Sequence, residues 1–358
     1  MALRIADVSS LYAERSGGIR TYLEAKAAWA RRTGSIEQHL VIPGPERRSA
    51  DNRHELRGVQ YAAANGYRVP VGGAAMRETI GDIEPDVVLL HDPFWTPART
   101  AREARAADRL VVAVHHTSVD LNAGAFPLTP KLWRRGLRRW YRHAYRGVDA
   151  VMSAIDPYAD TGRRAELQLR LGLHPAFHPR PAVMPGPHVL YAGRFSREKG
   201  VDVLLEATAL GDWELVLHGA GPWENGMRDR IRSLKLEDRV RVEPFIADRD
   251  RLAHEFARAR CVVAPGAYET FGLAALEAAA CGSAVAYAET APSGELLGGL
   301  GHAFRAHDAE DLARAIGAAS AAPRRHREAA ALARHHRWDA AFEAEVRDLE
   351  ELLGRRGA

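Results

Sequence analysis

Short runs of apolar, often β-branched residues alternate along this chain with longer stretches in which apolar residues recur at helical spacing. Repeated strand–helix units of this kind form parallel sheets. In the first half the predicted buried strands are 4–8, 87–90 and 110–114. In the second half they are 189–191, 214–217, 239–242, 261–264 and 284–287. The pattern therefore predicts an α/β protein with two Rossmann-like, doubly wound parallel-sheet domains.

A proline-rich segment separates the two halves. Residues 174–188 carry five prolines and one glycine, a composition that cannot continue a helix or a central strand. The tail from Arg337 has helical spacing through Trp338, Phe342, Val346, Leu349 and Leu352. We predict an N-terminal Rossmann-like domain over 1–175, a second Rossmann-like domain over 176–336, and a C-terminal helix over 337–358 that crosses back to the N-terminal domain.

Length and composition fit this two-domain interpretation. The chain has 358 residues, more than one hydrophobic core usually supports, and 46% hydrophobic with 27% charged residues is typical of globular proteins. Cys261 and Cys281 lie in apolar stretches without metal-like spacing, which favours buried thiols over a disulfide or a zinc site. Residues 1–10 lack the apolar core of a signal peptide, and no stretch is apolar enough to span a bilayer. We expect a cytoplasmic protein.

The formal charge of +4 is unevenly distributed. Residues 121–148 contain no acidic residue, and segment 131–146 holds a dense basic set: Lys131, Arg134, Arg135, Arg138, Arg139, Arg142 and Arg146. An apolar stripe of Trp133, Leu137, Trp140, Tyr141 and Ala144 makes this helix amphipathic, and we expect that stripe to pack on the N-terminal sheet. The basic face is either solvated or rests on anionic lipid at the inner face of the membrane. Nucleic acid is disfavoured because no recognition motif accompanies the charge.

Residues 265–282 follow a predicted buried strand and open a helix. Free amides and the helix dipole favour an anion at such a helix start, and Gly272 allows a ligand to approach the backbone of Phe271 and Leu273. Glu269 and Glu277 are separated by slightly more than two helical turns, so both carboxylates can face one side and accept hydrogen bonds from hydroxyl groups. The alternative is a dipole-favoured Glu followed by an exposed Glu in an alanine-rich helix.

Residues 193–200 form a second glycine-bounded loop after a predicted strand. Its two cations, Arg194 and Lys199, can clamp a diphosphate, with the guanidinium forking onto oxygens and the ammonium acting as a point charge. Taken alone, the pair could also be ordinary loop charge, with Lys199 paired to Glu198.

Together, these stretches resemble the family 4 glycosyltransferases of the two-Rossmann (GT-B) architecture. The resemblance rests on the Glu-x7-Glu spacing of Glu269 and Glu277, on the sequence GRFSREKG at 193–200, and on Gly219-x-Gly221-Pro222. Weaker matches run from Gly17-Gly18 to Trp338. The likeness implies two domains facing a cleft, with the domain 1–175 on the acceptor side and the domain 176–336 binding the nucleotide sugar. It also implies transfer from that sugar with retention of configuration. It implies no cofactor and no required metal.

The resemblance also implies roles for individual residues. Arg194 and Lys199 would hold the diphosphate, Glu277 the ribose hydroxyls, and Glu269 the hydroxyls of the donor sugar. His115 best matches the family's histidine, which contacts the donor sugar near the reacting carbon, and His116 is the alternative. The implied catalytic set is His115, Arg194, Lys199 and Glu269. The remaining donor-binding residues are the loop glycines Gly17, Gly18 and Gly219, then Phe245 near the base, then Phe271, Gly272 and Leu273.

Three features test the limits of the likeness. Leu171 to His174 stands where the family usually has an Asn-Gly-(Val or Ile)-Asp stretch, so interdomain contacts or acceptor binding can differ. Pro265-Gly266 replaces the common Pro-Ser. Asp248 and Asp250 form an Asp-x-Asp pattern, which we interpret as a helix start rather than a metal site because the cationic loop already supplies positive charge.

The prediction is a hexosyltransferase that uses a UDP or GDP sugar and a lipid, polysaccharide or small-molecule acceptor. Two alternatives stay open: a sugar-nucleotide epimerase of the same architecture, and a non-catalytic nucleotide-sugar-binding module. The Glu-x7-Glu pattern disfavours the first, and the four motif side chains disfavour the second. Sugar, base, acceptor and oligomeric state depend on loop shapes and surfaces that this sequence does not determine.

Overall fold

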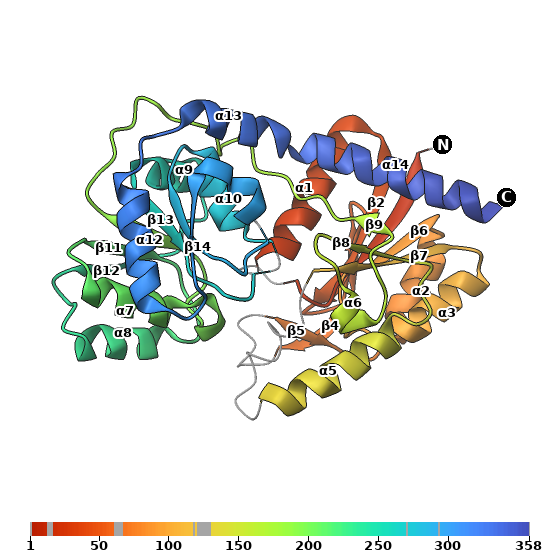
Figure 1. Cartoon of the computed structure of the whole chain (residues 1–358). Helices are drawn as coiled ribbons and strands as arrows, with labels where there is room; N and C mark the ends of the chain where they lie inside the picture. The colour runs from red at the N-terminus through yellow and green to blue at the C-terminus, as the bar shows by residue number, and fades with distance from the viewer. Residues whose placement is uncertain are drawn as a thin grey trace. The chain divides into compact units, whose positions relative to one another are not determined.

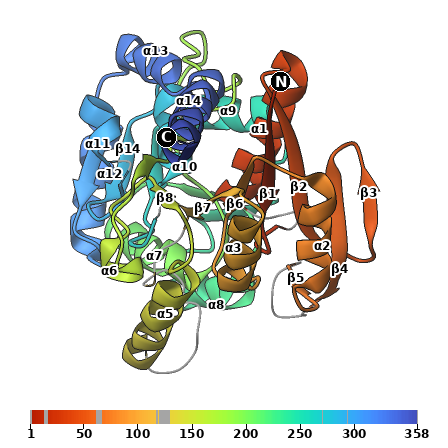
Figure 2. The same ribbon diagram turned by 90° about the vertical axis from the view of Figure 1, so that its right-hand side faces the viewer.

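The computed structural model describes residues 2–12, 17–60, 67–116, 119, 130–269, 271–292 and 294–357, with only the backbone of 130–132 and 357. It divides the chain into two compact units. Unit 1 comprises Met1–Gly172 and Trp338–Ala358, and unit 2 comprises Leu173–Arg337. Figure 1 and Figure 2 show each unit as a twisted sheet with helices on both faces.

Unit 1 alternates strands and helices, beginning with a parallel strand pair. Its strands are β1 (Leu3–Val8), β2 (Ile36–Gly44), β3 (Arg48–Ala50), β4 (Arg53–Gln60), β5 (Arg68–Pro70), β6 (Val87–Leu90), β7 (Leu110–His115), β8 (Ala150–Ser153) and β9 (Leu167–Gln168). Its helices are α1 (Gly18–Thr33), α2 (Ala74–Ile83), α3 (Pro97–Ala106), α5 (Pro130–Ala144), α6 (Tyr158–Thr161) and α14 (Trp338–Gly357).

Among the described residues, the sheet of unit 1 has the strand order β3-β4-β2-β1-β6-β7-β8-β9, and β5 also pairs with β4. β3 and β5 run antiparallel to β4, whereas the remaining neighbours are parallel. The chain passes from β1 to β2 on one side and later returns to β6 on the other side of β1. The strand order therefore reverses between β1 and β6, where open α/β sheets bind ligands.

Unit 2 repeats the scheme with a shorter sheet. Its strands are β10 (Val189–Ala192), β11 (Leu215–His218), β12 (Val240–Glu243), β13 (Cys261–Ala264), β14 (Val285–Ala288) and β15 (Gly301–Phe304). Its helices are η2 (Arg197–Lys199), α7 (Val201–Leu210), α8 (Glu224–Ser233), α9 (Arg249–Arg258), α10 (Leu273–Ala280), α11 (Gly294–Leu297), η3 (Gly298–Leu300), α12 (Ala309–Ala321) and α13 (His326–His335).

The sheet of unit 2 is parallel throughout, with the order β12-β11-β10-β13-β14-β15. Strands buried on both faces are apolar at successive positions, which explains why they read as continuous hydrophobic runs. One core joins the sheet to α7, α8 and α12 through residues such as Leu204, Met227 and Ile316. A second core joins the opposite face to α9 and α10 through Phe256 and Leu276.

The predicted fold class is confirmed: both units are Rossmann-like α/β domains with largely parallel sheets. Each strand predicted from its apolar run begins and ends within one residue of an observed strand. The sequence analysis did not identify β2, β4, β8 or β15. β4 mixes charged and apolar residues, and only Leu56 and Gly58 of that strand are buried.

The last helix belongs to unit 1. α14 packs along α1 in both views, where Phe342 lies against Tyr22 and Trp29 (Figure 1, Figure 2). At the junction, Gly172 leaves room for the start of this helix, because a Cβ on it would lie 2.5 Å from the backbone nitrogen of Trp338. Residues at both ends of the chain therefore build one hydrophobic core.

Candidate active site

The strand order of unit 2 reverses at β10. From β10 the chain forms β11 and β12 on one side, then returns to form β13 and the following strands on the other. Loops that follow β10 and β13 therefore leave the carboxyl edge of the sheet in opposite directions, at the position where open α/β sheets bind ligands. The two sequence motifs, 193–200 and 265–272, are these loops.

Glycines let the loops after β10 and β11 pack against each other. A Cβ on Gly219 would lie 1.9 Å from the carbonyl oxygen of Gly193, and one on Gly221 would lie 2.2 Å from that of Phe195. The backbone NH of Phe195 donates to the carbonyl of Ala220 at 3.0 Å. The structure thus gives Gly219, a predicted donor-binding residue, a packing role beneath the cationic loop.

Lys199 and Glu269 form an ion pair that joins the loop after β10 to the loop after β13. Lys199 Nζ lies 2.7 Å from Glu269 Oε1, and their side chains are 29% and 19% exposed. Lys199 ends the short helix η2, and Gly200 follows in a left-handed conformation at φ 67°. Since a Cβ at Gly200 would lie 2.4 Å from the carbonyl oxygen of Pro265, only glycine allows this close approach of the two loops. Lys199 pairs with Glu269 rather than with the neighbouring Glu198.

Arg194 lies in the same loop with a half-buried side chain. The backbone carbonyl of Arg194 accepts a hydrogen bond from the Tyr191 hydroxyl at 2.8 Å, which holds the loop against β10. Its Nε is buried and, within the described part of the chain, has no hydrogen-bond partner. A buried donor without an acceptor is costly, so this guanidinium is ready to bind an anion.

The helix α10 begins where the β13 loop ends. Gly272 is its N-cap residue, in a left-handed conformation at φ 76°, and no side chain caps the first turn. The amide of Ala275 donates to the carbonyl of Gly272 at 3.0 Å. The amides of Leu273 and Ala274 precede the first helical hydrogen bond and have no backbone acceptor among the described residues, so they are available to an anion. Phe271 lies just before the cap and packs on the core of unit 2, so its backbone is anchored there.

Glu277 lies one turn further along α10 and is buried. Burial raises its pKa to about 7, and the nearby Arg249 lowers it only in part. The Nη1 atom of Arg249 lies 3.8 Å from Glu277 Oε1. Both carboxylates of the Glu-x7-Glu pattern thus lie near cations, Glu269 beside Lys199 and Glu277 beside Arg249.

The Asp-x-Asp pattern is a helix start, as predicted. Asp248 is the N-cap residue of α9, and its side chain accepts a hydrogen bond from the amide of Arg251 at 2.7 Å. Asp250 pairs with Arg180 at 2.9 Å. Phe245, the residue expected near a nucleobase, precedes α9 and is 56% exposed, so its ring is accessible for stacking.

The predicted residues of unit 1 lie at the carboxyl edge of its own sheet. Gly17 is the N-cap residue of α1, where a Cβ would meet no atom of the described residues within 4 Å, and Gly18 is the first helical residue. Ser16, which precedes them in the sequence motif, lies outside the described residues. Neither glycine carries a side chain that would keep a phosphate from the first backbone amides of this helix.

His115 and His116 point to different surroundings. His115 ends β7, is 3% exposed, and lies against the rings of Tyr141 and Tyr145. Burial lowers its pKa to about 4, so its imidazole is neutral at physiological pH. His116 lies on the opposite side of the sheet edge, stacked on His91, with its Nε2 2.7 Å from Nδ1 of His91.

Comparison with known proteins assigns the chain to a family. Residues 16–164 match the family model "Glycosyltransferase Family 4", and residues 178–336 match "Glycosyl transferases group 1". The chain is a family 4 glycosyltransferase. The resemblance inferred from the motifs is therefore confirmed, as is the assignment of the chain to an enzyme class.

Relatives and solved structures agree with this assignment. The glycosyltransferase is 28% identical to a GDP-mannose-dependent alpha-(1-6)-phosphatidylinositol dimannoside mannosyltransferase of Mycobacterium tuberculosis, over 91% of this chain and 90% of that protein. Its fold is similar to that of a sucrose-phosphate synthase from Thermosynechococcus elongatus, with a TM-score of 0.78, 19% identity, and coverage of 99% and 100% of the two chains. It is also similar to Anabaena HepE in complex with UDP and glucose, with a TM-score of 0.71, 17% identity, and coverage of 98% and 100%.

The basic helix α5 of the glycosyltransferase corrects one expectation. Leu137, Tyr141 and Ala144 are buried as predicted, but Trp133 and Trp140 are 42% and 43% exposed. They border the buried face, and the indole NH of Trp140 donates to the carbonyl of Pro93 at 2.7 Å. The opposite face exposes arginines at positions 135, 139, 142 and 146, whereas the side chain of Lys131 lies outside the described residues.

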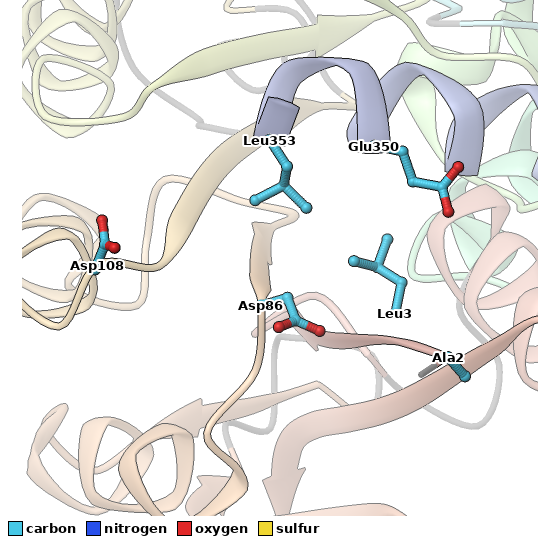
Figure 3. A pocket seen from close by; sticks show the side chains of 6 residues that line it. All are labelled: Ala2, Leu3, Asp86, Asp108, Glu350 and Leu353. Carbon is cyan, nitrogen blue, oxygen red and sulfur yellow. The ribbon is translucent and has the colours of Figure 1, made fainter. Parts of the chain in front are cut away.

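A pocket of about 310 Å³ lies in unit 1, away from the predicted site residues (Figure 3). Leu3 and Leu353 point into it, and its polar lining comes from Asp86, Asp108 and Glu350. These residues lie at the starts of β1, β6 and β7 or on α14, which is the amino edge of the sheet. Ligands of open parallel sheets bind at the carboxyl edge, so we assign this pocket no role in the enzyme's chemistry.

The sequence analysis missed a polar cluster at the carboxyl edge of unit 1. Asp92 accepts hydrogen bonds from the amide and hydroxyl of Ser10 at 2.5 and 2.8 Å, which ties the loop after β6 to the loop after β1. Asp7 and His91 lie beside it, both buried. The sequence carries a signal for this cluster: polar residues stand at or just after the carboxyl ends of the apolar strands β1 and β6, the end at which parallel sheets bind ligands.

Proposed function

We propose that the enzyme transfers a hexose from a nucleoside diphosphate sugar to a hydroxyl group of a lipid acceptor, with retention of the anomeric configuration. The observation that carries this proposal is the grouping of Arg194, Lys199, Glu269 and the start of α10 at the reversal point of unit 2. GDP-mannose is the first donor to test, because the mycobacterial relative that matches most of the chain uses it.

In this proposal the diphosphate binds between the loop after β10 and the start of α10. The unsatisfied Nε of Arg194, the ammonium of Lys199 and the uncapped amides of α10 all provide positive charge or hydrogen-bond donors. Negative charge develops on the diphosphate as its bond to the sugar breaks. Hydrogen-bond donors that are already oriented toward this charge stabilise the transition state. These two side chains supply positive charge without a bound metal ion, and the reaction we propose needs none.

The two carboxylates take the hydroxyl groups. Glu277, buried at the inner end of the site, would accept hydrogen bonds from the ribose, and these bonds would offset the cost of its burial. Glu269 would bind hydroxyls of the donor sugar while Lys199, 2.7 Å away, keeps it oriented. Binding of the donor would then rearrange this ion pair, because the diphosphate competes for the same ammonium.

The acceptor hydroxyl would attack the sugar on the face that the diphosphate leaves. Its oxygen forms the new bond to the anomeric carbon as the carbon–phosphate oxygen bond breaks, and a phosphate oxygen takes its proton. The products are the glycosylated acceptor and the nucleoside diphosphate. The anomeric configuration is retained because attack and departure share one face.

A lipid acceptor fits the exposed surface of α5. Trp133 and Trp140 flank a face of exposed arginines, an arrangement that suits the boundary between lipid headgroups and acyl chains. No helix in the described part of the chain is long and apolar enough to cross a bilayer. We propose that the enzyme contacts the anionic inner face of the membrane peripherally, as the mycobacterial relative's phosphatidylinositol-based acceptor would require.

Calorimetric titration with GDP-mannose, UDP-glucose and ADP-glucose, with and without EDTA, tests the donor. We expect one sugar nucleotide to bind, and EDTA to leave its affinity unchanged. Nuclear magnetic resonance of the product formed with a phosphatidylinositol mannoside acceptor then reports the anomeric configuration. An α-linked product from an α-linked donor supports retention, and a β-linked product contradicts it.

Two variants test the site itself. Lys199→Ala and Glu277→Ala should each weaken donor binding by roughly tenfold or more, the value of a charge-assisted hydrogen bond. Lys235→Asn and Glu237→Gln, at exposed positions after α8, are matched controls that should bind normally. Normal binding by both site variants would refute the proposed location of the donor.

A further inference from the structure

Three polar side chains form a hydrogen-bonded chain at the carboxyl edge of the sheet in unit 1. Asp7 lies near the end of β1, His91 directly follows β6, and His116 directly follows β7. His91 Nε2 lies 2.7 Å from Asp7 Oδ1, and His91 Nδ1 lies 2.7 Å from His116 Nε2. We call this hydrogen-bonded chain of Asp7, His91 and His116 the relay. Since β1, β6 and β7 are neighbours in the sheet, the relay crosses the β1/β6 reversal point.

The carboxylate at the inner end of the relay is charged. Burial would raise the pKa of Asp7, but Lys26, His91 and Gln38 together lower it to about 2. Lys26 Nζ lies 3.2 Å from Asp7 Oδ1, and the amide nitrogen of Gln38 donates to Asp7 Oδ2 at 2.7 Å. An ionised carboxylate only accepts hydrogen bonds, so Asp7 requires a proton on the nitrogen that faces it.

This requirement places a proton on Nε2 of His91. When that proton is the only one on the ring, Nδ1 of His91 is an acceptor and Nε2 of His116 is the donor that faces it. Nδ1 of His116 is then an acceptor too, with no partner among the described residues, and His116 is partly exposed at the sheet edge.

We propose that Asp7 and His91 are positioning residues that hold His116 as the Nε2–H tautomer, so that its Nδ1 accepts a hydrogen bond from a substrate hydroxyl. The inference deepens the proposed function, on which it rests. A sugar or lipid acceptor is rich in hydroxyl donors, and an acceptor nitrogen of fixed orientation discriminates among them without paying for a tautomer change on binding.

The same geometry excludes His115 from this role. His115 lies on the other side of the strand, where Tyr141 and Tyr145 cover its ring, and its Nδ1 lies 3.4 Å from the Tyr145 hydroxyl. Successive side chains of a strand point to opposite faces, so only one of the two histidines can join the relay. The relay therefore assigns the hydroxyl contact to His116, the alternative that the sequence offered beside His115.

The relay is held from behind by α1 and α14. Lys26 also pairs with Glu345 at 2.7 Å, and Glu345 accepts a hydrogen bond from the Tyr22 hydroxyl. The Tyr22 ring lies edge-on to His116, with ring centroids 5.6 Å apart. Among the described residues, the charged and titratable groups around His116 are thus Asp7 on β1, Lys26 and Tyr22 on α1, Glu345 on α14, His91 after β6 and His115 on β7.

Nitrogen-15 spectra of the full-length protein labelled at histidine test the tautomer directly. Signals are assigned with His91→Asn and His116→Asn. We expect a protonated Nε2 and an unprotonated Nδ1 on both rings. A proton on Nδ1 of His116 would overturn the proposal, and this measurement needs neither turnover nor an identified acceptor.

Kinetics separate positioning from simple packing. We expect His116→Ala and His91→Leu to lower kcat/KM by about tenfold or more, because an orienting hydrogen bond is lost. His91→Asn should recover most of the activity, since an amide can donate to Asp7 and accept from His116. Tyr145→Phe removes the partner of His115 and is the control, with turnover close to that of the wild type.

Two results would overturn the inference while leaving the proposed function intact. One is wild-type turnover in His116→Ala. The other is equal loss in His91→Leu and His91→Asn with thermal stability unchanged, which would show that the orienting hydrogen bonds do not matter. Failure of donor binding in unit 2, in contrast, would refute the proposed function. The nitrogen-15 spectra would still show whether His116 is the Nε2–H tautomer.

Discussion

Individual charged side chains of the candidate site are held where water solvates them poorly. Glu277 is the extreme case: it is buried on α10, and the Nη1 atom of Arg249 lies 3.8 Å from its carboxylate. A carboxylate of this kind is destabilising when ionised and becomes useful only when hydroxyl donors or cations reach it. Ligand binding can therefore offset the unfavourable desolvation free energy of the ionised Glu277 carboxylate.

Glu277→Gln should stabilise the free enzyme at high pH and not at low pH. The pKa of Glu277 is raised from 4.5 to about 7 in the folded state, so between these values the folded protein binds more protons than the unfolded chain. Its contribution to stability is therefore lost as pH rises through this window, by up to about 3 kcal/mol. Gln carries no such penalty.

Urea unfolding at pH 4.5 and pH 8 measures the effect, with Glu237→Gln as an exposed control. The stability difference between Glu277→Gln and wild type should grow from near zero at pH 4.5 to its full value at pH 8. The same difference at both pH values would contradict a raised pKa. Donor binding should weaken in the same variant, so stability and function change in opposite directions.

At the scale of secondary structure, individual helices determine where the side chains of the candidate site lie. η2 and α10 begin or end at glycines in left-handed conformations, Gly200 and Gly272, and these caps bring two loops together at the sheet edge. In unit 1, the helix α5 has one face on the core and the other exposed, with Trp133 and Trp140 at the border between the two. An amphipathic helix thus both completes a core and presents a charged surface.

The exposed face of α5 should bind anionic vesicles. Reversing two charges, Arg135→Glu with Arg139→Glu, should lower binding to phosphatidylglycerol vesicles by at least about tenfold, since each arginine near the surface contributes about 1 kcal/mol. Sedimentation with vesicles at low and high salt measures the affinity. Arg228→Glu with Arg232→Glu on α8 is the matched control, because these residues are also exposed arginines.

Equal binding to neutral phosphatidylcholine vesicles, or no change in the α5 variant, would contradict contact through this face. High salt should weaken the wild-type interaction because the attraction is electrostatic and screened. Loss of binding in the α8 control as well would mean that net charge, rather than this helix, determines the affinity.

At the level of the whole molecule, the two ends of the chain build one unit. α14 contributes Phe342 to the core beside Tyr22 and Trp29, and Glu345 to the buried ion pair with Lys26. Unit 2 is continuous in sequence and lies between these segments. The stability of unit 1 therefore depends on residues that follow unit 2 in the chain.

A chain that ends at Arg337 should lose the structure of unit 1 and keep that of unit 2. Removing α14 exposes the Tyr22 and Trp29 rings and leaves Lys26 without one of its two carboxylate partners, a change that costs several kcal/mol. Limited proteolysis should cut first within residues 1–172, while calorimetry should still detect nucleotide binding. A chain that ends at Gly354 is the control, and an intact unit 1 in the shorter chain would contradict the prediction.

Local information in the sequence determined much of this protein. Apolar runs located the central strands β1, β6, β7, β10, β11 and β13 and their neighbours β12 and β14, because strands buried on both faces are apolar at successive positions, whereas β2, β4, β8 and β15 were not located. Glycine and charge patterns located the loops 193–200 and 265–272 at helix starts, and this local chemistry also predicted the family. Asp248 was identified as a helix cap for the same reason, since capping involves only neighbouring residues.

Only the tertiary structure decided which distant side chains meet. Adjacent residues of a strand point to opposite faces, so the sequence could not show which side chains His115 and His116 each contact. The fold places His115 against Tyr141 and Tyr145, and His116 against His91. The relay of Asp7, His91 and His116 needs three strands brought together by the β1/β6 reversal. Trp133 and Trp140 stay exposed because the width of the buried face of α5 depends on its neighbours. Periodicity determines which residues share a side, whereas contacts between segments far apart in the chain determine what that side meets.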